Sequence, residues 1–325
     1  MPVTVTIQDR SKEVLPPAKL DDYEQTGEHR EGQKAFALWI FFIVVLVSGL
    51  YASSFTREIG VLIFLWWLGA CLWYFYLAPK TLLKKMRLEN REHAITPASQ
   101  PHLYATLSKG AVLLNLKTTE TYLLPDGMPQ IRVFSPPSFM TITQQAADLV
   151  QPAELDCLIL RQLMHFRQKH VSRLMMFYLL RDAQPTVRLL SWPVGLYAFF
   201  LRMWWLDLAE MSVDRLTLLL IKNHKTIASA LLKQHAATDP EMSEYKITSG
   251  DVDAYMEQNG LISFEGREIS TQYRLGQAIR ENPYLDERLQ ALSTFAESYE
   301  FKEAIQRLAD ARAQKTGAPV SAAKS

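Results

Sequence analysis

The chain has 325 residues, which is long enough for one good-sized globular domain together with anchoring elements. Its formal net charge of +1 gives no bulk electrostatic reason to expect nucleic acid or a strongly acidic substrate as a partner. The only two cysteines, Cys71 and Cys157, lie in an apolar run and in an expected helix, which argues against a disulfide framework.

Long apolar runs are concentrated near the N-terminus. The polar segment 1–34 has no apolar core of the kind found in a cleavable signal peptide. Two uncharged runs follow, at 36–55 and 59–78, and each is about 20 residues long, enough for a helix to cross ~30 Å of hydrocarbon. The sequence therefore predicts a transmembrane hairpin over 35–79. The alternative is a buried hairpin in a soluble core.

Basic residues flank this hairpin on the side of both chain ends. They are Arg30 and Lys34 before the first run, and Lys80, Lys84, Lys85, Arg87 and Arg91 after the second. The turn between the runs offers only Arg57. Because short loops rich in lysine and arginine stay in the cytoplasm, we expect both termini there, in the inner membrane of a bacterium.

Residues 80–312 are expected to form a mostly helical α+β domain with a small β-sheet. Helical periodicity covers 80–120, 152–170, 171–180 and 207–234, and short strand-like stretches lie at 130–134 and 139–143.

A second apolar segment, 187–206, contains Pro193 and Arg202. It is compatible with a helix in or against the membrane surface and equally with a buried helix. Short helices and a turn near 260–266 are expected after residue 240, and the tail 313–325 is expected to be disordered.

Three segments occur in an informative order. The first pairs the stretch 139–143 with a helix that carries Arg-Gln-Leu-Met-His at 161–165. The second reads Glu-Met-Ser-Val-Asp-Arg at 210–215, and the third begins Asn-Pro at 282 and contains Arg288. Together they resemble the HtpX and CAAX-prenyl-protease family of zinc metallopeptidases, family forty-eight. The resemblance covers roughly residues 97–300 and implies a zincin-like (gluzincin) peptidase domain.

In that family the helix reads His-Glu-x-x-His, in which two histidines bind zinc and the glutamate is the general base. The resemblance places Arg161 at the first histidine and Gln162 at the base. His165, Glu210 and Asp214 remain as metal-site positions. Arginine cannot ligate a metal and glutamine cannot accept the proton of a bound water. We therefore expect no catalytic residue and no cofactor.

No other residue is expected to rescue the site. His170 would lie about 140° from His165 around a continued helix, and Cys157 would lie ~12 Å away along the axis. Instead we expect Arg161 to pair with Glu210 or Asp214 and so to replace the positive charge of zinc. The alternative is an exposed Arg161 and a solvated Glu210.

Three functions remain open. The first is an inactive, membrane-anchored pseudopeptidase that binds a polypeptide or scaffolds a membrane complex. Strand 139–143 or its neighbour would then align an extended peptide. The second is an active zinc metalloendopeptidase of membrane-protein quality control with an atypical ligand set. The third is a purely structural subunit of a membrane complex. The expected partners are the lipid bilayer and a protein or polypeptide, not nucleic acid.

Overall fold

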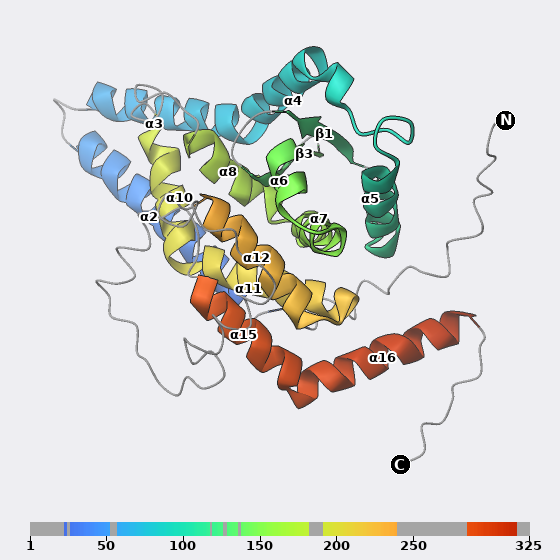
Figure 1. Cartoon of the computed structure of the whole chain (residues 1–325). Helices are drawn as coiled ribbons and strands as arrows, with labels where there is room; N and C mark the ends of the chain where they lie inside the picture. The colour runs from blue at the N-terminus through green and yellow to red at the C-terminus, as the bar shows by residue number, and fades with distance from the viewer. Residues whose placement is uncertain are drawn as a thin grey trace.

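The computed structural model describes residues 23–24, 27–52, 57–117, 119–125, 129–135, 138–181, 191–238 and 285–316. Within them the fold is mostly helical with one small mixed sheet (Figure 1). The larger helices are α2 (Glu28–Ala52), α3 (Arg57–Leu72), α4 (Ala78–Glu89), α5 (Pro101–Leu113), α7 (Pro152–Arg167), α8 (Val171–Arg181), α10 (Trp192–Trp204), α11 (Leu206–Ile221), α12 (His224–Thr238), α15 (Leu285–Glu297) and α16 (Tyr299–Thr316). The turn expected at 260–266 lies outside the described residues.

The sheet has three strands in the order β1 (Glu120–Leu124), β3 (Phe139–Thr143) and β2 (Ile131–Phe134). Strand β3 pairs in parallel with β1 and antiparallel with β2. All five residues of β3 are buried. Since β3 is paired on both sides, it cannot accept an added peptide strand, which corrects one of the two possibilities considered from the sequence.

Strand β1 was missed by the sequence analysis, which extended one helix over 80–120. The structure instead has α4, a short 3-10 turn (Arg91–His93), α5 and then β1. Asn115 adopts a left-handed backbone with φ of 55°, directly after α5 ends at Leu113. Helical periodicity alone does not reveal such a stop, although asparagine is, after glycine, a residue that favours the left-handed position at a helix end.

Helix α7 occupies the centre of the molecule and packs against α5, α11, α12 and strand β2. Gln151 and Glu154 form a capping box at its first turn, and Pro152 fits there because the first helical N–H needs no partner. Helix α5 approaches closely at Gly110, where an added Cβ would lie 2.6 Å from Leu163 Cδ1. Because α5 and α7 are this close at Gly110, a larger residue there would force one of the two helices to move.

Helices α11 and α12 were expected to form one helix over 207–234. Lys222, with φ of 60°, ends α11, and Asn223 caps the start of α12 with its side-chain oxygen. The break lets α12 pack on α7, while α15 packs on both α11 and α12. Helix α16 continues to Thr316, so the beginning of the tail expected to be disordered is helical.

The N-terminal helices form a second, aromatic-rich cluster with α8 and α10. Helix α2 begins at Glu28, within the segment expected to precede the membrane. Among the described helices, Glu28–Ser48 is the one stretch long and apolar enough to cross a membrane. Helix α3 is shorter, and it continues through a π-helical segment, η2 (Trp73–Leu77), into α4. The expected segment 187–206 contains α10, which packs on α2, α3 and α8.

Among the described residues, most of the exposed large hydrophobic side chains lie on these N-terminal helices. On α2 they are Phe36, Leu38, Phe41, Phe42, Val44 and Val45, and on α3 and η2 they are Ile59, Val61, Leu62, Phe64, Leu65, Leu68, Leu72, Trp73, Tyr76 and Leu77. Phe41 and Leu62 are each 65% exposed. Monomeric soluble proteins rarely expose so extended an apolar surface.

Candidate functional site

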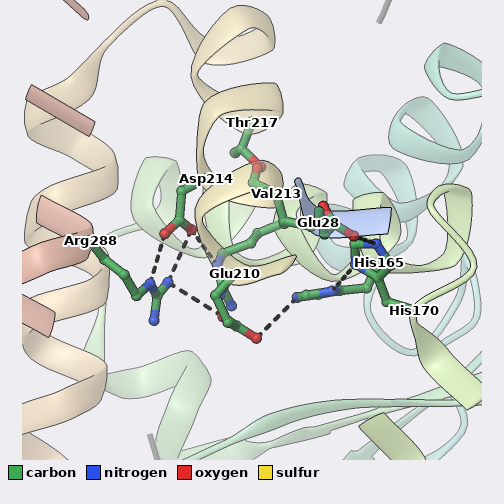
Figure 2. A network of polar contacts seen from close by, with 9 residues as sticks. Glu28, His165, His170, Glu210, Val213, Asp214, Thr217 and Arg288 are labelled. Atoms are coloured by element: carbon green, nitrogen blue, oxygen red, sulfur yellow. Dashed lines mark hydrogen bonds and ion pairs between the residues drawn. The ribbon is translucent and has the colours of Figure 1, made fainter. Parts of the chain in front are cut away.

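The facing sides of α7, α11 and α15 bring the three sequence motifs together. Arg161, Gln162 and His165 come from α7, Glu210 and Asp214 come from α11, and Arg288 comes from α15. All six residues are buried, and Figure 2 shows contacts among His165, Glu210, Asp214 and Arg288.

Arg161 lies between the two carboxylates of α11. Its Nη2 contacts Glu210 Oε2, and its Nε donates a hydrogen bond to Asp214 Oδ1 at 2.7 Å. Either carboxylate was expected from the sequence as its partner, and in the structure Arg161 contacts both. Glu210 and Asp214 are four residues apart, so they lie on one face of α11, one turn from each other.

Arg288 completes this cluster from the other side. Its Nε donates to Asp214 Oδ2 at 2.8 Å and its Nη2 donates to Oδ1 at 3.0 Å, which is the paired geometry that favours arginine over lysine. Its Nη2 also lies 3.5 Å from Glu210 Oε2. Two guanidinium groups therefore balance two carboxylates. We call Arg161, Glu210, Asp214 and Arg288 the charge cluster.

Burial and charge act in opposite directions on these groups. Burial alone would raise the pKa of Asp214, but the positive charges of Arg288 and Arg161 and their hydrogen bonds hold it below its usual value. Burial lowers the pKa of Arg161, the charge of Arg288 lowers it further, and Asp214 opposes both. Asp214 is thus held as a carboxylate between two cations.

His165 connects the charge cluster to a second polar chain. Its Nε2 lies 3.6 Å from Glu210 Oε1, and its Nδ1 lies 3.3 Å from His170 Nδ1. One proton must lie between the two Nδ1 atoms, since a hydrogen bond needs one donor and one acceptor. Burial, together with the charges of Arg161 and His170, lowers the pKa of His165 well below its usual value.

The contact between His165 and His170 corrects an expectation from the sequence. A continued helix would have separated the two rings, but α7 ends at Arg167 and Lys169 takes a left-handed backbone with φ of 58°. The chain then folds back, and the His170 N–H donates to the His165 carbonyl at 3.0 Å. This is the helix-ending turn that glycine usually makes, so the sequence offered no signal for it.

Glu28 extends the polar chain to helix α2. Its Oε1 lies 2.6 Å from His170 Nε2, and its side chain also bonds Ser212 of α11. Figure 2 shows Glu28 beside His170 and His165. Sequence reasoning missed this residue because it stands in a polar stretch with no motif around it. Its only signal is its place in the polar first turn of a helix that becomes apolar further along.

Gln162, at the position of the general base, is buried beside Arg161. Its Oε1 has no hydrogen-bond partner among the described residues. Cys157 is fully buried in the main core, and burial raises the pKa of its thiol. Neither group offers a nucleophile or a base at the charge cluster.

The same described part of the chain contains no group of three or more histidine, cysteine, aspartate or glutamate side chains placed to hold a metal ion. At the charge cluster the positions that could offer donor atoms are Glu210, Asp214 and His165. Both carboxylates are already engaged by guanidinium groups. The chemistry that the residues present support is ion pairing.

A second buried ion pair lies at the start of α7. Lys233 of α12 donates to both carboxylate oxygens of Glu154, at 2.8 and 2.7 Å, and Ser229 donates to Oε1 at 2.5 Å. The Gln151 N–H donates to Oε2 at 2.8 Å. This pair anchors the first turn of α7, and the sequence analysis did not identify it.

The chain was compared with protein-family models, with curated proteins and with solved structures, and none of the three comparisons gives a match.

Proposed function

We propose that this protein is a membrane-anchored, catalytically inactive relative of the HtpX and CAAX-prenyl-protease metallopeptidases that binds a polypeptide or scaffolds a membrane complex. The observation that carries this proposal is the position of Arg161. Its guanidinium stands between Glu210 and Asp214, where the resemblance implies a zinc ion. A fixed cation from the protein then satisfies the carboxylates that a metal would otherwise hold.

The convergence of the three motifs supports the family part of this proposal. Arg161, Asp214 and Arg288 belong to three separate segments, yet they share one set of hydrogen bonds. Residues that merely matched a short pattern by chance would not be expected to meet in the core.

The apolar N-terminal surface supports the membrane part. Helix α2 has the length of a spanning helix, and α3 continues through η2 to Leu77 with no charged side chain after Glu58. The proposal places both in the bilayer, with α10 packed against them and both chain ends in the cytoplasm. A reporter enzyme fused after Ser325 should be active only in the cytoplasm, and activity only outside it would reverse this orientation.

Zinc measurement tests the catalytic part directly. Detergent-purified protein should contain far less than one zinc per chain, because Arg161 and Gln162 remove one ligand and the base. Elemental analysis that gives close to one zinc per chain would instead support the active peptidase.

A reversion experiment tests the correspondence with the family site. The double variant Arg161→His/Gln162→Glu recreates His-Glu-x-x-His, and His165 Nε2 already lies 3.6 Å from Glu210. Without metal, this variant should melt below the parent because it loses a buried cation. Zinc should then stabilise it, by ~2.7 kcal/mol when free zinc is a hundredfold above its dissociation constant.

The matched control is Arg161→Gln/Gln162→Glu, which loses the same cation but gains no imidazole. Zinc should not shift its melting temperature. If zinc shifts neither variant, Glu210 is not placed as a ligand and the correspondence with the family site is wrong. If zinc shifts both equally, the metal binds elsewhere.

Polypeptide binding is separated from a purely structural role by cross-linking in native membranes. A binding protein should yield cross-links from the edge strand β2 to extended segments of other chains. A structural subunit should yield them only from its outer surface.

A further inference from the structure

We infer that the exposed lysines of α4 form a docking surface for anionic phospholipid headgroups at the cytoplasmic face of the membrane. This inference rests on the proposed membrane anchor and goes beyond it, because it assigns a lipid class to a particular helix. The lysines concerned are Lys80, Lys84 and Lys85, called the α4 lysines below.

The first observation is a sharp boundary along one continuous helical path. From Ile59 to Ala78 the chain has no charged residue, and most large side chains of α3 and η2 are exposed. The α4 lysines begin two residues later, and no acidic residue occurs until Glu89. Figure 1 shows α3 leading directly into α4. A change from exposed apolar to exposed basic side chains is what the surface of a bilayer requires.

The second observation is an aromatic contact at the boundary. Lys80 Nζ lies 3.5 Å from the centre of the Tyr76 ring, and Tyr76 is 50% exposed. Tyrosine is favoured at the headgroup level because its ring is apolar and its hydroxyl is polar. The contact therefore holds the first lysine at the depth where phosphate groups lie.

The third observation is that these positive charges are only weakly neutralised by the protein. Neither Lys80 nor Lys84 forms an ion pair in the part of the chain that the structure describes. Lys85 is 3.7 Å from Glu89, and both side chains are well exposed, so this pair contributes little. By contrast, Arg87 is paired with Glu120 at 2.5 Å and is not counted among the α4 lysines.

The geometry of α4 places two of these charges side by side. Lys80 and Lys84 are four residues apart, so they project from one face of the helix. Leu83, between them in sequence, is buried in a cluster with Tyr122 of β1 and Met175 of α8, which fixes the position of α4. The helix is therefore held with its lysines outward, next to the proposed bilayer surface. Each lysine near an anionic surface strengthens binding by about fivefold.

The test uses the full chain purified in a neutral detergent. It is titrated with short-chain phosphatidylglycerol, with short-chain phosphatidylcholine and with inorganic phosphate, and binding is followed by thermophoresis. We expect phosphatidylglycerol to bind at least tenfold more tightly than phosphatidylcholine, and inorganic phosphate to bind far more weakly than either lipid. The triple variant Lys80→Gln/Lys84→Gln/Lys85→Gln should lose the preference for phosphatidylglycerol.

The matched control is Lys117→Gln/Lys225→Gln/Lys302→Gln, which removes the same charge from exposed positions outside α2, α3, η2 and α4. It should keep the full preference. Equal affinity of the parent for the two lipids, or an equal loss in both triple variants, would overturn the inference. Inorganic phosphate that matched phosphatidylglycerol would show a general anion site instead of a lipid surface.

Failure of the membrane anchor itself has a different signature. In that case the chain would stay soluble without detergent and would not float with vesicles of either lipid. A chain that floats with phosphatidylcholine vesicles but shows no headgroup preference would overturn the α4 inference alone.

Discussion

Helix α7 carries two buried ion-pair systems that differ in what they connect. At its start, Glu154 meets one lysine and one serine of α12, and its other hydrogen bond comes from its own helix cap. Near its middle, Arg161 enters a cluster that joins α7, α11 and α15. The first system fixes one helix end, whereas the second holds three helices together. Although both systems are buried, we therefore do not expect them to contribute equally to the free energy of unfolding.

The largest effect is expected when the charge cluster loses one cation. Arg161→Ala leaves Glu210 and Asp214 with Arg288 alone, so one buried negative charge has no full partner. We expect a loss of about 3–5 kcal/mol in the free energy of unfolding, measured by denaturant titration in detergent. The double variant Arg161→Met/Glu210→Gln should lose less than the sum of its single variants. Additive losses would show that the two side chains are not coupled.

A smaller effect is expected at the start of α7. Lys233→Met removes the ammonium group, but Glu154 keeps the Ser229 hydroxyl and the Gln151 N–H. We therefore expect a loss of about 1–3 kcal/mol, because the N-terminus of α7 and the two remaining hydrogen bonds still stabilise the Glu154 carboxylate. If Lys233→Met cost as much as Arg161→Ala in the same titration, the proposed distinction between the two systems would be wrong.

The pH dependence of stability offers a third comparison. The pKa of His165 lies well below its usual value in the folded protein, so the unfolded chain binds a proton first as the pH falls below about 6.5. Stability should therefore decrease below that pH. His165→Asn should remove about 1 kcal/mol of this decrease between pH 7.5 and 5.5.

Asp214 contributes to the same dependence of stability on pH, but at lower pH than His165. Its pKa is also lowered, so its contribution is present above about pH 4 and is lost as the pH falls further. His165→Asn should leave this loss of stability below about pH 4 unchanged. A variant with the parental pH profile between 7.5 and 5.5 would mean that His165 is not held neutral.

The smallest effect is expected at an exposed ion pair. Arg87 and Glu120 form a close pair with side chains 57% and 47% exposed. Because water and salt screen such charges, Arg87→Gln should leave the denaturation midpoint unchanged within error. A clear shift would show that this pair organises β1 in a way that its exposure does not suggest.

Local patterns in the sequence were sufficient to predict α7. Pro152 and Glu154 mark its start, and its apolar periodicity is long and regular. The four-residue spacing of Glu210 and Asp214 was sufficient to bring both carboxylates to one helical face. These features could be predicted because each depends on residues within one or two turns.

The connections between distant segments were not predictable in the same way. Strand β1 was hidden by the helical pattern before it, and its pairing with β3 depends on contacts across the sheet. The meeting of His165 with His170 depends on a left-handed Lys169, for which lysine is not a typical residue. The contact of Glu28 with His170 joins residues more than 100 positions apart. Hydrogen bonds and charge stabilise the buried Glu28 carboxylate there, between side chains that no local pattern brings together.

The position of Glu28 also bears on how a soluble fragment of this protein could be made. Cutting the chain after the apolar hairpin would be the natural way to avoid detergent. That cut would remove Glu28, the partner of His170, and with it Trp39 and Ile43, which pack against α8, α10 and α11 in the second core cluster. The remaining fragment would expose apolar surface that α2 normally covers and would tend to aggregate. Crystallisation or binding studies should therefore retain the chain from before residue 28.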